Sequence, residues 1–271
     1  MNGAVFENIR LETGIILSSG ARIGGFVGLI NGGTVTFRNC YNKVMVESLN
    51  TAGGFVARIM GTSTVIFEKC ANLASVATTG SSSSYAGGFV GTIDGTSSNL
   101  TFEFCYNIGD IRESHELIAG FVGQVIRGTV NINNSFNDAE INIYNSNPSI
   151  ETRKGAFTTR IGGTVNVNDS YFNETIFDGA ACYGGGNINN VPNMTSENLR
   201  HQNFVTMLND IAGEELFELN DGEVGFTVLY LKYTLTFLPG DGVGESYEMI
   251  RNKTDSVTTL PHNGMLNYPG L

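Results

Sequence analysis

The chain has 271 residues, of which 41% are hydrophobic, so it is long and apolar enough to fold around a substantial core. Only 15% of its residues are charged, and its formal net charge is −11. This charge argues against nucleic-acid binding, which needs clustered lysine and arginine, and against docking on anionic lipid. No run of about 18 apolar residues is present, so we predict no membrane insertion within this segment.

A short unit, in which a glycine or alanine precedes a phenylalanine, recurs along the first 178 residues. Each unit is followed by a glycine-containing turn and then by a stretch in which apolar and polar residues alternate, as in Thr34-Val35-Thr36-Phe37. Such alternation predicts short strands. The phenylalanines stand 29 to 36 residues apart, at Phe26, Phe55, Phe89, Phe121 and Phe157.

Two further columns keep a fixed offset from these strands. A cysteine or serine stands five residues after the first apolar strand residue, and an aliphatic residue stands six residues later. The pairs are Cys40 and Val46, Cys70 and Val76, Cys105 and Ile111, Ser135 and Ile141, and Ser170 and Ile176. A unit of about 30 residues cannot bury its own apolar face, but stacked units can. The sequence therefore predicts an all-β fold over residues 1–178, a parallel β-helix (β-solenoid) of about five turns with the Phe, Val and Cys/Ser columns inside.

The chain opens within a repeat. Gly3-Ala4-Val5 matches Gly33-Thr34-Val35, which predicts Arg10 at the cysteine position and Ile16 at the next aliphatic position. Because a solenoid needs caps over its ends, we expect this sequence to be a piece of a longer protein.

The repeated motifs resemble a known family. Gly24-Gly25-Phe26-Val27-Gly28 and Asn39-Cys40-Tyr41-Asn42 resemble the GLUG repeat of bacterial surface proteins. In the last two copies serine replaces the cysteine, and Ala156-Phe157-Thr158 replaces Gly-Phe-Val. The resemblance implies an extracellular location, at the cell surface or in the cell wall.

Residues 179–232 are predicted to be a C-terminal capping segment with one helix. Thr195 or Ser196 is a suitable N-cap, and Gly213 is a suitable end of the helix. Phe204 and Leu208 share one helical face. We expect them to pack on the last turn of the solenoid, near Val165, Val167 and Ile176.

Residues 233–271 have a different pattern. Tyr233–Phe237, Leu260–Gly264 and Tyr268–Gly270 are similar to a Listeria–Bacteroides repeat, a small β module that would be only partly present here. Gly240–Gly244 lacks the lysine of a phosphate loop, and we predict a hairpin turn there.

Three of the four cysteines share one column. Neighbouring Cα atoms of such a ladder are about 4.8 Å apart, within disulfide range. The Cβ directions are parallel, however, so we predict that Cys40, Cys70 and Cys105 stay reduced. Cys182 lies in a glycine-rich segment.

No set of cysteines and histidines has zinc-site spacing. His115-Glu116 resembles the first half of the H-E-x-x-H motif, but Ala119 stands where the second histidine is needed. We therefore predict no metal site, no catalytic residues and no cofactor.

Glu68 and Glu103 remain as candidate acids, because β-helix folds host polysaccharide lyases and hydrolases. They would stack on neighbouring turns, and Arg38 beside Glu68 favours a neutralising surface ladder. The predicted function is a non-enzymatic, extracellular, rod-like stalk or adhesion module that binds an unknown protein or glycan on a host or neighbouring cell. The alternative is a polysaccharide-active β-helix enzyme.

Overall fold

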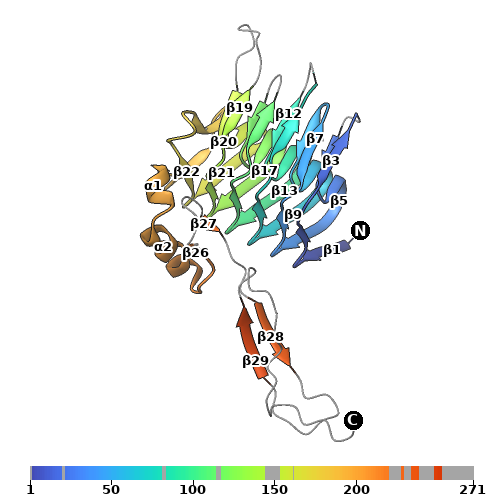
Figure 1. Ribbon diagram of the computed structural model, residues 1–271. Helices are drawn as coiled ribbons and strands as arrows, with labels where there is room; N and C mark the ends of the chain where they lie inside the picture. The colour runs from blue at the N-terminus through green and yellow to red at the C-terminus, as the bar shows by residue number, and fades with distance from the viewer. Residues whose placement is uncertain are drawn as a thin grey trace, which may run out of the picture. The chain divides into compact units, whose positions relative to one another are not determined.

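A computed structural model describes residues 2–19, 22–80, 84–113, 117–143, 153–160, 162–219, 227–228, 233–237 and 247–251. The chain divides into two compact units, Met1–Leu199 and Arg200–Leu271. The first unit is a parallel β-solenoid, which confirms the predicted fold class. Its turns are stacked in chain order from the blue to the yellow ribbon (Figure 1).

Three parallel sheets line the solenoid, and successive turns contribute neighbouring strands to each sheet. Long strands of the 13-stranded sheet are β1 (Asn2–Glu7), β5 (Val27–Arg38), β9 (Val56–Glu68), β13 (Val90–Glu103) and β17 (Val122–Asn133), continued by β21 (Thr164–Asn168) and β24 (Asn187–Asn189). The same sheet contains β4 (Arg22–Gly24), β8 (Thr51–Gly53), β12 (Tyr85–Gly87), β16 (Leu117–Ala119), β20 (Arg153–Arg160) and β23 (Ala180–Tyr183).

The other two sheets are made of shorter strands. The seven-stranded sheet contains β2 (Arg10–Leu11), β6 (Tyr41–Asn42), β10 (Ala71–Asn72), β14 (Tyr106–Asn107), β18 (Phe136–Asn137), β22 (Tyr171–Asn173) and β25 (Asn193–Met194). The five-stranded sheet contains β3 (Ile15–Ser18), β7 (Met45–Ser48), β11 (Val76–Thr78), β15 (Ile111–Glu113) and β19 (Ile141–Ile143). Parallel pairing thus continues past residue 178, through β23, β24 and β25.

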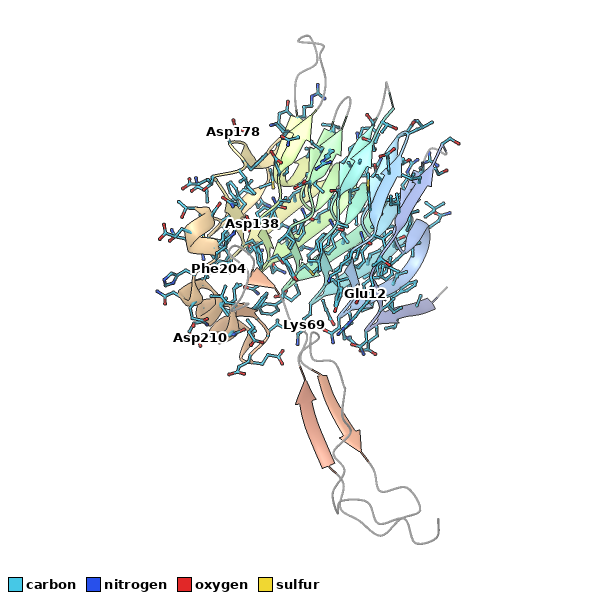
Figure 2. All side chains as sticks on the ribbon, viewed as in Figure 1. Glu12, Lys69, Asp138, Asp178, Phe204 and Asp210 are labelled. Carbon is cyan, nitrogen blue, oxygen red and sulfur yellow. The ribbon has the colours of Figure 1, made fainter. Side chains whose placement is uncertain are left out.

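Side chains fill the space between the sheets (Figure 2). Two ladders of phenylalanine rings are part of this core. In the ladder of the Gly-Phe units, Phe55, Phe89, Phe121 and Phe157 are fully buried, which confirms the predicted inward direction. Phe37 and Phe67 belong to the second ladder, where their ring centroids are 4.7 Å apart and nearly parallel. The two ladders meet edge to face, as between Phe55 and Phe67 at 5.4 Å. Both arrangements are favourable for aromatic pairs.

A ladder of asparagines, which the repeat pattern did not predict, runs beside the Gly-Gly-Phe bends. Asn42, Asn72 and Asn107 are fully buried, and each donates from Nδ2 to Oδ1 of the asparagine on the next turn, at 2.8–3.0 Å. Asn42 and Asn72 also donate from Nδ2 to the carbonyl two residues later. These bonds satisfy polar groups that would be costly to bury unpaired.

The cysteine ladder is buried, and Cys40, Cys70 and Cys105 are free thiols, as predicted. The Cys70 thiol can donate its one proton to the carbonyl of Glu68, at 3.3 Å, or to that of Phe37, at 3.4 Å. Burial, followed by a hydrogen bond with Cys105, raises the pKa of Cys70 well above its ordinary value of 9.0. Folding therefore favours the protonated thiol.

The stability of the first unit should fall at alkaline pH for this reason. The unfolded chain releases the Cys70 proton near its ordinary pKa, whereas the folded chain retains it, so stability is complete below about pH 9 and is lost as the pH rises further. Cys70→Ser should reduce that loss while keeping the fold, because Ser135 and Ser170 occupy the same column and donate to equivalent carbonyls. Urea unfolding at pH 7 and pH 10 in reductant measures the effect. Equal alkaline losses in the parent and the variant would contradict it.

The structure corrects the predicted register at two places. In the first turn, Ala4 pairs with Val35 and Ile9 takes the cysteine position, because the chain bulges at Gly3 (φ 82°). This shift lets Phe6 stack on Phe37 at 4.7 Å and leaves Val5 58% exposed. Ile16 does pair with Val46, as predicted.

The second correction is at the end of the aliphatic column. Val46, Val76, Ile111 and Ile141 are buried, but Ile176 is 38% exposed in a turn. The neighbouring Phe177 packs into the core in its place, against Phe172.

The predicted single helix is two helices. Thr195 caps α1 (Ser196–Leu199) through its Oγ1, and His201 caps α2 (Gln202–Ala212) through its Nδ1. The extended backbone of His201 separates them, and Gly213 ends α2 in a left-handed conformation, as predicted. Phe204 and Leu208 are buried. Because α2 belongs to the second unit, their packing on the last solenoid turn stays a prediction.

The second unit also contains two antiparallel strand pairs. β26 (Glu218–Leu219) pairs with β27 (Thr227–Val228), and β28 (Tyr233–Phe237) pairs with β29 (Tyr247–Arg251). The strands on either side of Gly240–Gly244 therefore form a hairpin. The predicted turn itself and residues 260–270 lie outside the described residues.

Candidate binding groove

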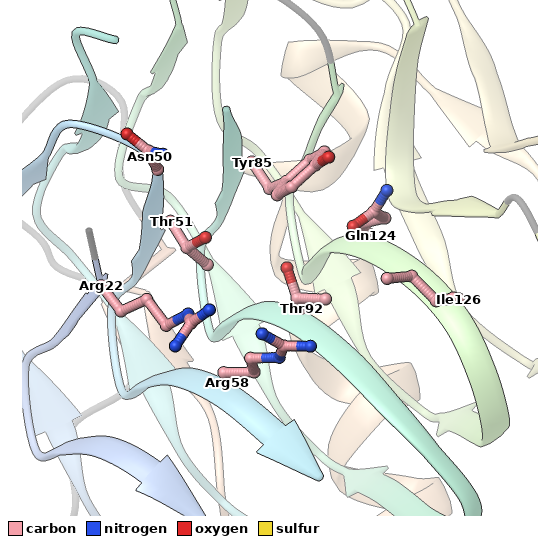
Figure 3. Close-up of a pocket in the computed structure, with 8 residues that line it drawn as sticks. All are labelled: Arg22, Asn50, Thr51, Arg58, Tyr85, Thr92, Gln124 and Ile126. Carbon is pink, nitrogen blue, oxygen red and sulfur yellow. The ribbon is translucent and has the colours of Figure 1, made fainter. Parts of the chain in front are cut away.

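A pocket of about 280 Å³ lies on the flank of the first unit (Figure 3). Most of its lining residues have a polar group in the side chain, and they come from successive turns of the solenoid. The lining residues are Arg22, Asn50, Thr51, Arg58, Tyr85, Thr92, Gln124 and Ile126. We call this pocket the flank groove.

Strand register places most of these side chains in two columns. On one wall, Arg22 of β4, Thr51 of β8 and Tyr85 of β12 are direct neighbours in the sheet. On the other wall, Arg58 of β9 pairs with Thr92 of β13, which pairs with Gln124 of β17. The groove therefore runs across consecutive turns.

The sharp Gly-Gly-Phe bend brings the two walls together. A Cβ atom added at Gly91 would lie 2.5 Å from Cγ2 of Thr51 and 2.6 Å from the carbonyl oxygen of Ala57. Gly91 thus permits the start of β13 to approach the outer side of β8. The concavity depends on this close approach, because a side chain there would separate the walls.

Positive charge is concentrated at the groove, although the whole chain is acidic. Arg58 Nη2 is 2.7 Å from Asp94 Oδ2, and both side chains are largely buried. Arg127 Nε is 3.3 Å from the other oxygen of Asp94. Among the described residues, Arg22 has no ion-pair partner. There are thus three arginines and one aspartate here, which leaves an excess of positive charge. Asp94 also holds Arg58 in position.

Two neutral side chains in the groove lack hydrogen-bond partners within the described chain. Thr92 is 3% exposed and Gln124 is 4% exposed. Thr92 Oγ1 and Gln124 Oε1 are nevertheless unpaired. Because buried polar atoms are normally bonded, their position at a pocket suggests that something else satisfies them.

Glu68 and Glu103 lie next to each other in register, but elsewhere on the surface. Arg38 Nε donates to Glu68 Oε2 at 2.7 Å, and Arg38 also pairs with Glu7 at 3.2 Å. Glu103 accepts hydrogen bonds from Asn133 and Asn134. The predicted pairing of Arg38 with Glu68 in a surface ladder is thus confirmed.

His115 and Glu116 lie outside the described residues. In the part of the chain that the structure does describe, no three His, Cys, Asp or Glu side chains are grouped as metal ligands.

The flank groove was not predicted from the sequence. A weak signal was available, because the second position after the Gly-Phe-Val unit changes from Leu29 to Arg58, Thr92 and Gln124 on successive turns. The residue type in this column changes from turn to turn, so the repeat pattern does not indicate it.

In comparisons with known proteins, no family model, no curated protein and no solved structure matches this chain. Within the described ranges, no helix is long and apolar enough to cross a membrane.

Proposed function

We propose that this chain is an extracellular, non-catalytic stalk or adhesion module of a bacterial cell-surface protein. The observation that carries the proposal is the continuous stack of solenoid turns, whose interior is filled by phenylalanine, cysteine and asparagine ladders. Each ladder repeats the same contact from turn to turn. Such an array is suited to presenting side chains at fixed spacing along one flank.

Charge and the surface ladders also support an interaction role. The net charge of −11 favours a well-solvated surface. Arg38 binds Glu68, and Asn133 and Asn134 bind Glu103, which supports a structural role for these stacked acids. The resemblance of the repeats to the GLUG family is consistent with a location at the cell surface or in the cell wall.

A panel of glycans and host-matrix proteins, tested for binding and for polysaccharide turnover, examines this proposal. We expect saturable binding to at least one ligand and no turnover by the parent chain. Glu68→Gln and Glu103→Gln serve as matched variants and should leave binding unchanged. Turnover that either variant abolishes would overturn the proposal in favour of a polysaccharide-active enzyme.

A further inference from the structure

We propose that the flank groove binds an acidic oligosaccharide, with a sugar carboxylate on Arg22 and sugar hydroxyls on Thr92 and Gln124. The inference rests on the proposed role as an interaction module, and it adds a site and a class of ligand. The volume of the flank groove, about 280 Å³, is at the lower end of the range for ligand pockets. It suits a short segment of a glycan.

The hydrogen-bonding requirements of the groove favour a ligand with hydroxyl groups. Gln124 Oε1 is an unpaired acceptor and needs a donor, while the Thr92 hydroxyl can donate or accept. A simple anion such as a carboxylate ion has no donor for Gln124. Sugar hydroxyls both donate and accept, so they satisfy both side chains.

The charge of the groove favours an acidic sugar over a neutral one. Arg58 is already bound to Asp94. Arg22 has no ion-pair partner among the described residues, so its guanidinium is available to an incoming anion. Arginine binds carboxylates through two parallel hydrogen bonds. Tyr85 adds an aromatic ring to the same lining, where the apolar face of a sugar ring can pack (Figure 3).

The backbone around the groove argues against an extended peptide as the ligand. A peptide commonly binds by adding a strand to a free sheet edge. The strands that form the walls are interior ones: β8 pairs with β4 and β12, and β13 pairs with β9 and β17. Their backbone groups are already used, so recognition has to come from side chains.

Calorimetric titration of the full chain with oligogalacturonate and with its carboxyl-reduced counterpart tests the proposal. We expect the acidic form to bind about tenfold or more tightly, because the reduced form loses a charge-assisted hydrogen bond. Arg22→Gln should remove that difference. Thr92→Val, which keeps the side-chain volume, should weaken binding of both forms.

Arg38→Gln is the matched control, because it removes the same charge from an exposed ladder away from the groove. It should leave both affinities unchanged. Equal losses in Arg22→Gln and Arg38→Gln would show general charge attraction and would overturn the proposal. Equally tight binding of oligoglutamate would also overturn it and would indicate a site for acidic peptides. If neither saccharide binds while another ligand of the panel does, the glycan site is refuted and the interaction module stands.

Discussion

Replacing Phe89 by alanine should lower the free energy of unfolding of the first unit by about 3–5 kcal/mol. Phe89 is fully buried, and its ring lies 5.1 Å from that of Phe55 and 4.9 Å from that of Phe121 in the same ladder. It also meets Phe67 and Phe102 edge to face, at 5.5 and 5.2 Å. The substitution therefore removes contacts with four rings and leaves a cavity that stacked turns cannot close.

Urea unfolding measured by circular dichroism provides the free energy. Phe26→Ala is the matched control, because Phe26 belongs to the same ladder but is only partly buried near its end. We expect its cost to be clearly smaller. A loss below about 1 kcal/mol for Phe89→Ala would mean that the ladder does not determine stability.

Gly88→Ala should be nearly as disruptive, although it adds one methyl group. Its Cβ atom would lie 2.1 Å from the carbonyl oxygen of Gly120 and 2.7 Å from the side chain of Asn107. The carbonyl belongs to the next turn, so no rotamer change relieves the contact. Displacing Asn107 would also break the buried bonds to Asn72 and Asn137. Overpacking and unpaired amides together should cost about 3 kcal/mol or more.

Gly28→Ala is the control for this prediction. Gly28 is exposed, and nothing lies within 4 Å of an added Cβ atom. We expect the melting temperature of the Gly28→Ala variant to stay close to that of the parent, while the Gly88→Ala variant melts many degrees lower or fails to fold. Similar melting temperatures for the two variants would refute the close approach of the turns.

The last repeat shows when alanine is tolerated at this position. Ala156 occupies the place of Gly88 and is fully buried. The next turn there has no Gly-Gly-Phe bend, and the pairing of β20 with β23 shifts register between Gly155 and Thr158. The change from glycine to alanine, which in the sequence alone is a decay of the motif, thus coincides with a change in the pairing to the next turn.

The repeat pattern was sufficient to predict the solenoid, the inward phenylalanines and the reduced cysteine column. Each of these depends on a repeated spacing along the chain, and stacking converts equal spacing into spatial neighbours. Predictions from the repeat spacing were wrong at two places in the solenoid. The bulge at Gly3 places Ala4, and not Val5, opposite Val35. In the last repeat Phe177, and not Ile176, packs in the core.

The asparagine ladder and the flank groove, by contrast, arise from contacts between turns and could not be predicted from the sequence. Asn42 and Asn72 are ordinary polar residues in sequence, and their burial follows from hydrogen bonds between turns that become visible only when the turns are stacked. The groove combines Arg22, Thr92 and Gln124, which share no motif and come from different turns. Its concavity arises because Gly91 lets two strands approach, so its position is a property of packing and not of any local pattern.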